Sequence, residues 1–310
     1  MTIAWYLYFI LPLIGFVGMF AGGYWGVGCG WLIVPVMLIF GFSPAEAVGV
    51  SLLQMVPSTL PVAIKDFPKI NWGRRSFGKR MILPLGIGCF ITAFTGRFIN
   101  AYLYGLFGST ALMVIFCLVN LFIGYQTLFS KPIQNEKALP VFTRKQSWIA
   151  FLGGLGTGIF SSLLGIGGAM IIRPILVNIF KVPEQWTARA VRILLLLTTS
   201  TGGLFYVISS GKQVGFEIFV LTLIISAGGM MGFPLGVKCN NIVCENGRAR
   251  TLQRSFVVIP CIVLSNTILK LLGLAEISRI LSLTFAVLLF IYIVSFTFYS
   301  QNHAVSQKEK

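Results

Sequence analysis

Two clusters of glycines are the residues in this sequence with the clearest potential to bind a ligand. Each cluster interrupts a long apolar stretch and is followed by a proline, Pro35 or Pro174. Such a break can divide a membrane segment into two partial helices, and the second then starts inside the membrane with free N–H groups and the positive end of its dipole. That arrangement favours binding of an anion. The clusters contain Gly26, Gly28, Cys29 and Gly30, and Gly165, Gly167 and Gly168.

The two clusters also have a purely structural interpretation, because small residues let membrane helices pack closely without any ligand. The repetition of the whole pattern in both halves of the chain, each time with the proline behind it, favours the anion site. Cys29 stands inside the first break, and a thiol there could contact a sulfur oxyanion. We favour the interpretation that Cys29 is simply a small residue, since its counterpart in the second cluster is Gly168.

Arg173 adds a positive charge to this candidate site. It is the only charged residue between Trp148 and Phe180, and the matching position in the first half is the apolar Val34. An arginine within a membrane segment is a functional candidate, and its planar fork suits a tetrahedral oxyanion. The alternative is a structural pair with a carbonyl group, or a side chain that reaches to the interface.

Uncharged polar residues follow each break on the next apolar stretch. Ser51 and Gln54, with Ser58 one turn later, form a polar stripe that either lines a path or joins helices, and Thr198 belongs to a similar group in the second half. Arg189 and Arg192 precede Thr198 and could gather anions at an entrance, or serve as ordinary inside-facing charges. The predicted ligands are Gly26, Gly28, Cys29, Gly30, Ser51, Gln54, Gly165, Gly167, Gly168, Arg173 and Thr198.

Composition indicates which kind of protein and secondary structure carries these residues. Among 310 residues, 56% are hydrophobic and only 10% are charged, which excludes a soluble globular protein. Eight acidic residues and one histidine, His303 in a polar tail, leave nothing for hydrolytic or metal-dependent catalysis, so we expect no enzyme, no cofactor and no metal site. The six cysteines lack zinc-type spacing. The apolar stretches are 5–42, 45–64, 81–98, 103–129, 148–180, 191–209, 216–237, 255–272 and 280–299.

These stretches predict an all-α, polytopic helical membrane protein, since hydrocarbon offers no partners for backbone polar groups and the stretches are too uniformly apolar for a barrel. The first 45 residues contain no charged residue and lack the basic start and cleavage site of a signal peptide, so we expect them to remain in the chain. The net charge of +16 lies in short segments between apolar stretches, which indicates topology and not nucleic-acid binding. The basic segments 65–80, 130–146 and 238–254 are predicted to be cytoplasmic.

Counting crossings agrees with that placement only if 5–42 and 148–180 do not simply cross, which favours re-entrant hairpins. The segment after 60–67 is strongly basic, whereas the one after the matching 199–206 carries only Lys212. The duplicated halves are therefore predicted to be inverted repeats. The predicted organisation is a first repeat 1–129, a cytoplasmic linker 130–147, a second repeat 148–273, a final transmembrane helix 274–300 and a polar tail 301–310. If the segment from Trp5 to Gly26 spans fully, the N-terminus moves to the other side and the number of crossings changes by one.

The sequence resembles the sulfite exporter family of the TauE/SafE type. The resemblance covers nearly the whole chain and depends on the duplicated cluster from Gly26 to Gly30 and from Gly165 to Ala169, on Pro35 and Pro174 after them, and on Pro44 and Pro183. The pair Asn71-Trp72 also fits. Departures are Cys29 and Ala169 at glycine positions and Val214-Gly215-Phe216 where a match to Trp72 is expected; they leave the ligand open. The resemblance implies a permease for sulfite, organosulfonates or related sulfur compounds.

Together these observations predict an exporter of a sulfur-containing anion, working by alternating access around a midplane site in the cell membrane. Outward movement of one negative charge across a membrane that is negative inside releases about 2.3 kcal/mol per 100 mV, so export needs no coupled ion. The alternatives are an importer of thiosulfate or sulfonates and, less favoured, a cation or metal permease or a membrane scaffold. The expected partners are the anion and the lipid bilayer. The sequence leaves open whether the protein forms a homo-oligomer.

Overall fold

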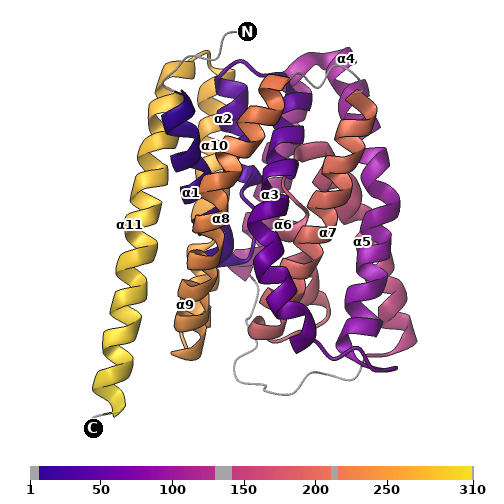
Figure 1. Cartoon of the computed structure of the whole chain (residues 1–310), viewed down its shortest axis with the longest axis vertical. Helices are drawn as coiled ribbons and strands as arrows, with labels where there is room; N and C mark the ends of the chain where they lie inside the picture. The colour runs from indigo at the N-terminus through magenta and orange to yellow at the C-terminus, as the bar shows by residue number, and fades with distance from the viewer. Residues whose placement is uncertain (1–6, 130–141, 211–215, 309–310) are drawn as a thin grey trace.

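The chain is a bundle of helices (Figure 1). The computed structural model describes residues 7–129, 142–210 and 216–308, and no strand occurs within that part of the chain. Six of the helices described there are long and apolar enough to cross a membrane, with mean hydropathies between 1.4 and 2.0. The prediction of an all-α, polytopic helical membrane protein is confirmed.

The described residues contain eleven α-helices and three shorter helical segments. They are α1 Leu7–Trp25, α2 Gly30–Ile39, α3 Pro44–Asp66, η1 Phe67–Lys69, η2 Gly78–Ile82, α4 Leu83–Phe129, α5 Arg144–Leu164, α6 Ala169–Pro174, η3 Ile175–Ile179, α7 Glu184–Ser210, α8 Phe216–Glu245, α9 Ala249–Ser255, α10 Val258–Leu271 and α11 Ala275–Lys308.

Both glycine clusters interrupt helices. α1 ends at Trp25 and α2 begins at Gly30, while α5 ends at Leu164 and α6 begins at Ala169. The chain turns at Gly26 and at Gly165, Gly167 and Gly168, whose φ values lie between 67° and 75°, the left-handed region that a side chain disfavours. With 10 residues, α2 is about 15 Å long, half of a bilayer core. Its length fits a re-entrant hairpin, and that hairpin stays a prediction.

The helices pair across the two halves of the chain. α1 packs most extensively against α8, and α4 packs most extensively against α5, so each half supplies one helix to the other. α3 and α7 lie together in the middle of the bundle and run antiparallel, because Gly49 at the start of α3 meets Tyr206 near the end of α7 while Asp66 at the end of α3 pairs with Arg192 (Figure 1). The reciprocal pairs and the antiparallel central helices support the inverted-repeat interpretation, which stays a prediction.

Several boundaries differ from those expected from hydropathy. α4 continues through 99–102 and breaks at Gly108, whose φ is 65°, because only a glycine tolerates that turn cheaply. α5 begins at Arg144, since Thr143 and Gln146 form a capping box. α11 extends to Lys308, as its polar end contains no Gly or Pro to stop it. Parts of the predicted linker and tail and the loop with Lys212 lie outside the described residues, at 1–6, 130–141, 211–215 and 309–310.

The basic segments lie at one end of the bundle. One cavity at this end is lined by Lys69 after α3, Arg189 in the first turns of α7 and Glu245 at the end of α8. Another cavity is lined by Arg80 and Arg144. We call this the basic end: the end where α3 and α8 finish and α4, α5 and α7 begin. The three basic segments therefore share one side where they are described, as the topology argument required. Their cytoplasmic placement is a prediction.

Glycines bring the paired helices into backbone contact. Gly228, Gly232 and Gly236 form a ridge at four-residue spacing on α8, and a Cβ on Gly232 would lie 2.2 Å from the carbonyl oxygen of Phe16 in α1. Gly158 in α5 meets the carbonyl of Cys89 in α4 in the same way, at 2.4 Å. Because lipid provides no hydrophobic drive between helices, such close approach is a main source of their association.

We therefore expect Gly232→Ala to lower the free energy of unfolding by about 1–3 kcal/mol, because the new methyl group must push α1 away from α8. Gly105→Ala is the matched control: a Cβ there meets nothing within 4 Å, and alanine favours a helix over glycine by roughly 1 kcal/mol. Thermal unfolding of the detergent-solubilised variants measures both. Equal stability of the two variants would contradict the role of the glycine ridge.

Candidate functional site

The two helix breaks meet each other in the middle of the bundle. A Cβ on Gly30 would lie 2.0 Å from the carbonyl oxygen of Gly165, so only glycine permits this approach. A Cβ on Gly28 would lie within 3.2 Å of both the carbonyl oxygen of Ile166 and the side chain of Leu195, near the middle of α7. We call the two breaks, residues 26–30 and 165–168, the crossing. It lies at mid-depth of the two central helices.

Polar side chains from the central helices bind the crossing. Ser51 of α3 donates a hydrogen bond to the carbonyl of Gly165 at 2.8 Å, and Thr198 of α7 donates to the carbonyl of Gly167 at 2.5 Å. The side-chain amide of Gln54 donates to the sulfur of Cys29 at 2.6 Å. Ser51 and Gln54 of the predicted polar stripe on α3 therefore reach the two breaks, whereas Ser58 donates to the carbonyl of Gln54 within α3 and lies against Gly229 of α8.

Two buried polar atoms at the crossing have no hydrogen-bond partner among the described residues: Oε1 of Gln54 and Oγ of Ser161. Ser161 lies in the last turn of α5, and its Cβ is 3.4 Å from where a Cβ on Gly168 would be. A buried polar group without a partner costs free energy, and a ligand is one way to satisfy it. The crossing thus combines two helix starts, at α2 and α6, with uncharged polar groups that suit a small polar ligand.

Ten of the eleven predicted ligands, every one except Arg173, lie at the crossing or on the α3 and α7 turns beside it. Cys29 is fully buried and is engaged by Gln54. Whether these residues contact a substrate stays a prediction. The structure adds that the two breaks contact each other and that the polar side chains of Ser51 on α3 and Thr198 on α7 reach the same place.

Arg173 takes part in a different set of contacts. Its guanidinium forms an ion pair with Glu184 at 2.5 Å, donates to the carbonyl of Trp25 and lies 5.9 Å from the ring of Phe256. A cation at the last carbonyls of α1 is favourable because that end of the helix carries negative partial charge. Arg173 therefore caps α1 at the first break. The prediction that it binds an anion stays open, but Glu184 already balances its charge.

Each helix that ends at a break also has an asparagine against it. Asn240 of α8 donates to the carbonyl of Tyr24, and Asn100 of α4 donates to the carbonyl of Leu163, both at 2.7 Å. Tyr24 and Leu163 are the next-to-last residues of α1 and α5. Because the last carbonyls of a helix lack intrahelical partners, these amides satisfy groups that hydrocarbon would leave unpaired.

Sequence reasoning missed two acidic residues, Asp66 and Glu184. Asp66 pairs with Arg192 at 2.6 Å across α3 and α7, and both side chains are buried. Glu184 also lies within electrostatic range of Arg192, so the two ion pairs form one charge cluster at the basic end. Each acid stands at the end of an apolar stretch, where it resembles an ordinary interfacial charge. The available signal was their scarcity, since the chain has only eight acidic residues.

A polar cavity of about 200 Å³ lies beside this charge cluster at the basic end. Arg192 is 2% exposed, and its Nη1 has no hydrogen-bond partner among the described residues. Thr198 and the crossing lie about 9 Å further along α7 from Arg192. The cavity is lined by Asp66, Lys69, Gln185, Ala188, Arg189, Arg192, Asn240, Asn241, Cys244 and Glu245.

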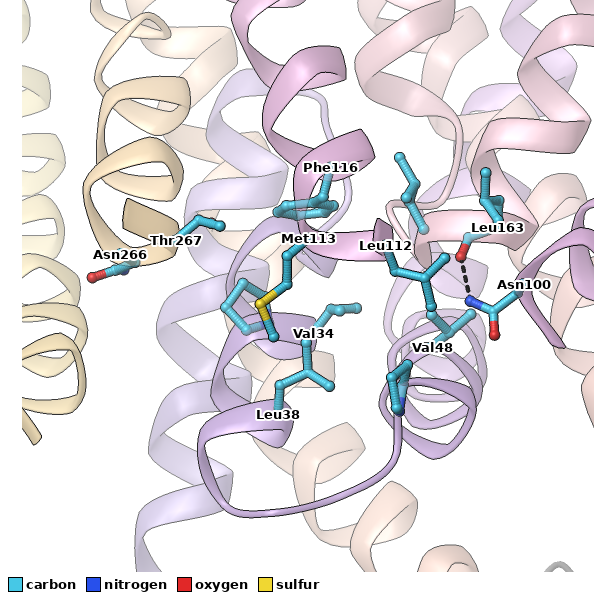
Figure 2. Close-up of a pocket in the computed structure, with 13 residues that line it drawn as sticks. Val34, Leu38, Val48, Asn100, Leu112, Met113, Phe116, Leu163, Asn266 and Thr267 are labelled. Carbon is cyan, nitrogen blue, oxygen red and sulfur yellow. Dashed lines mark hydrogen bonds between the residues drawn. The ribbon is translucent and has the colours of Figure 1, made fainter. Parts of the chain in front are cut away.

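The opposite side of the crossing is mostly apolar. Figure 2 shows a cavity there whose walls include Val34, Leu38, Leu112, Met113 and Phe116, with side chains from α2 facing those of α4. The uncharged polar residues Asn100, Asn266 and Thr267 also line it. Its volume is about 40 Å³, too small for more than a water or two. We call this the apolar end. Val34 occupies there the repeat position that Arg173 occupies at the basic end, so the two sides of the crossing differ in charge.

The fold and the site define a class: a polytopic helical membrane protein whose interrupted helices cross at mid-depth, with a charged side and an apolar side. The profile of one protein family, described as Sulfite exporter TauE/SafE, matches residues 11–267. The chain belongs to this family. It is therefore a membrane transporter and not an enzyme, as its sequence predicted.

Relatives with curated descriptions agree with that class. A probable membrane transporter protein of Methanocaldococcus jannaschii is 26% identical over 74% of this chain and 85% of its own length. The probable membrane transporter proteins YdhB and YunE of Bacillus subtilis are 28% and 22% identical, over 76% and 81% of this chain and 88% and 95% of their own lengths. No solved structure matches the chain.

The Arg173–Glu184 pair gives a testable asymmetry. We expect Arg173→Met to lower the free energy of unfolding by about 3–5 kcal/mol, because it leaves Glu184 buried without its partner. Arg173→Met/Glu184→Gln removes both charges and should recover much of that loss. Thermal unfolding in detergent measures the series as a double-mutant cycle. Independent, additive losses would show that the pair is not coupled.

Proposed function

We propose that this protein exports a sulfur-containing anion, such as sulfite or a small organosulfonate, across the cell membrane by alternating access around the crossing. The observation that carries the proposal is the convergence of both helix breaks beside the unpartnered hydroxyl of Ser161. The family description names sulfite export, which supports the same class of substrate.

The binding argument starts from the helix ends. α2 begins at Gly30, and α6 with η3 begins at Ala169 and continues to Ile179. The first N–H groups of a helix have no intrahelical partner and carry positive partial charge, which suits an oxyanion. The unpartnered hydroxyl of Ser161 can donate a further hydrogen bond, whereas the side-chain N–H groups of Gln54 already bind Cys29 and the carbonyl of Ser51. A site of dipoles without a full charge binds an anion weakly enough to release it, which transport requires.

Arg189 and Arg192 provide the route from the basic end. Arg192 presents an unpartnered Nη1 in the polar cavity, and Arg189 lines the same cavity with its guanidinium over Trp186 at 5.2 Å. Lys69 adds a third cation. Cations at the mouth of a cleft raise the local concentration of an anion. The anion would then pass along α7 to the crossing, while the apolar end stays closed.

Alternating access requires the charge cluster to rearrange. Asp66 and Arg192 join α3 to α7, while Arg173 and Glu184 join the second hairpin to the start of α7. Rocking of one repeat against the other would separate or exchange these partners, and an arriving anion could compensate Arg192 in place of Asp66. Export follows from the potential, because outward movement of one negative charge releases about 2.3 kcal/mol per 100 mV.

The first test is efflux of sulfite from proteoliposomes with an imposed potential that is negative inside. We expect the potential to accelerate efflux, and Thr198→Val to slow it roughly three- to tenfold, because the hydroxyl that fixes the Gly167 carbonyl is lost. Thr201→Val is the matched control, since Thr201 donates only to carbonyls of its own helix. No efflux of any sulfur oxyanion would overturn the function, whereas equal rates in both variants would overturn the site alone.

A second test concerns the polar cavity. Arg189→Gln should raise the half-saturating concentration of sulfite, presented on the side of the basic end, about fivefold while leaving the maximal rate unchanged. Raising the ionic strength should reduce the difference. Arg250→Gln makes the same charge change at an exposed residue outside the cavity and serves as control. An unchanged half-saturating concentration for Arg189→Gln would contradict this route.

A further inference from the structure

A second cavity at the basic end lies outside the proposed transport route. It is open, has a volume of about 490 Å³ and lies between the start of α4 and the start of α5. Its lining combines cations with mostly apolar residues. The cations are Arg74, Lys79, Arg80 and Arg144, and the other residues are Leu83, Pro84, Ile87, Ser147, Trp148 and Phe151.

The charge of this cavity is of one sign. Four cationic side chains from two separate stretches of the chain meet there, and no carboxylate is among the described residues that line it. The three ion pairs found in the described part of the chain involve Lys69, Arg173 and Arg192, none of which belongs to this cavity. Four neighbouring cations repel one another, and an anionic partner removes that repulsion.

The remaining wall of the cavity is apolar and faces outward. Leu83 is 47% exposed, Ile87 46% and Trp148 62%, and these residues belong to the first turns of two helices long enough to cross a membrane. Trp148 at a helix start is typical of the interface between headgroups and acyl chains. The cations therefore lie at headgroup level, with apolar side chains directly below them at the level of the first carbons of an acyl chain.

We propose that this cavity binds an anionic phospholipid, with the phosphate held by Arg80 and Arg144 and the acyl chain lying along Leu83 and Ile87. The bound lipid joins the first turn of α4 to the first turn of α5, which form one of the two most extensive helix pairs of the bundle. Basic pockets between transmembrane helices on the cytoplasmic side are a known setting for anionic headgroups. A free phosphate ion would use the cations but leave the apolar wall uncovered.

Trp148 provides the readout for a direct test. The purified full-length protein in zwitterionic micelles is titrated with brominated phosphatidylglycerol or brominated phosphatidylcholine, and quenching that disappears in Trp148→Phe is assigned to this cavity. We expect saturable quenching by the anionic lipid at low mole fraction and little by the zwitterionic one. Arg80→Gln/Arg144→Gln should weaken binding on the order of 20-fold, since each cation contributes roughly fivefold.

Lys65→Gln/Arg250→Gln is the matched control, because it removes the same charge from exposed residues at the basic end outside the cavity. It should leave the affinity within about threefold of the parent protein. Equal quenching by both lipids, or an equal loss of affinity in both double variants, would overturn the proposal. Displacement of the brominated lipid by millimolar inorganic phosphate would assign the cations to a free anion and overturn the lipid site. Normal thermal unfolding of the variants excludes misfolding as the cause.

Discussion

Backbone polar groups inside hydrocarbon must have partners, and the rest of this structure depends on how that constraint is met at the two helix breaks. The carbonyls that end α1 receive hydrogen bonds from Asn240 and Arg173, and the one near the end of α5 receives one from Asn100. Ser51 and Thr198 satisfy carbonyls within the second break. A break can therefore persist at mid-depth only because neighbouring helices bring donors to it.

This requirement explains the arrangement of the helices. Donors to the backbone carbonyls at the first break come from α6 and α8, and donors to those at the second come from α3, α4 and α7. The glycine ridge on α8 and the glycines of α5 allow the close contacts that place these donors within reach. The backbone carbonyls at each break are thus satisfied mainly by the other half of the chain, and either half alone would leave its own break unsatisfied. The interruption of the helices in one half therefore depends on the other half.

The two sides of the crossing differ in a way that a symmetric pair of repeats would not require. Val34 and Arg173 occupy matching positions, but only the second carries a charge, and only the basic end has the buried partners Glu184, Asp66 and Arg192. Separating buried ion pairs costs several kcal/mol unless each charge finds a new partner, whereas separating apolar walls costs mainly hydrophobic contact. Under the proposed alternating-access mechanism, opening the two ends would therefore meet different barriers, and an anion would lower only the one at the basic end.

The amino-acid sequence was enough to predict the membrane helices, the interruption at both glycine clusters and the common side of the basic segments, because hydropathy, glycine and charge act over short stretches of chain. It also placed Ser51, Gln54 and Thr198 next to the breaks through their spacing along α3 and α7. The tertiary structure alone decided that the breaks touch and that Arg173 pairs with Glu184 and caps Trp25. The tertiary structure also decided that Asp66 forms an ion pair with Arg192, which lies 126 residues further along the chain. Such pairings depend on which helices cross, and a buried ion pair leaves no local pattern, because each partner alone has the sequence signature of an interfacial charge.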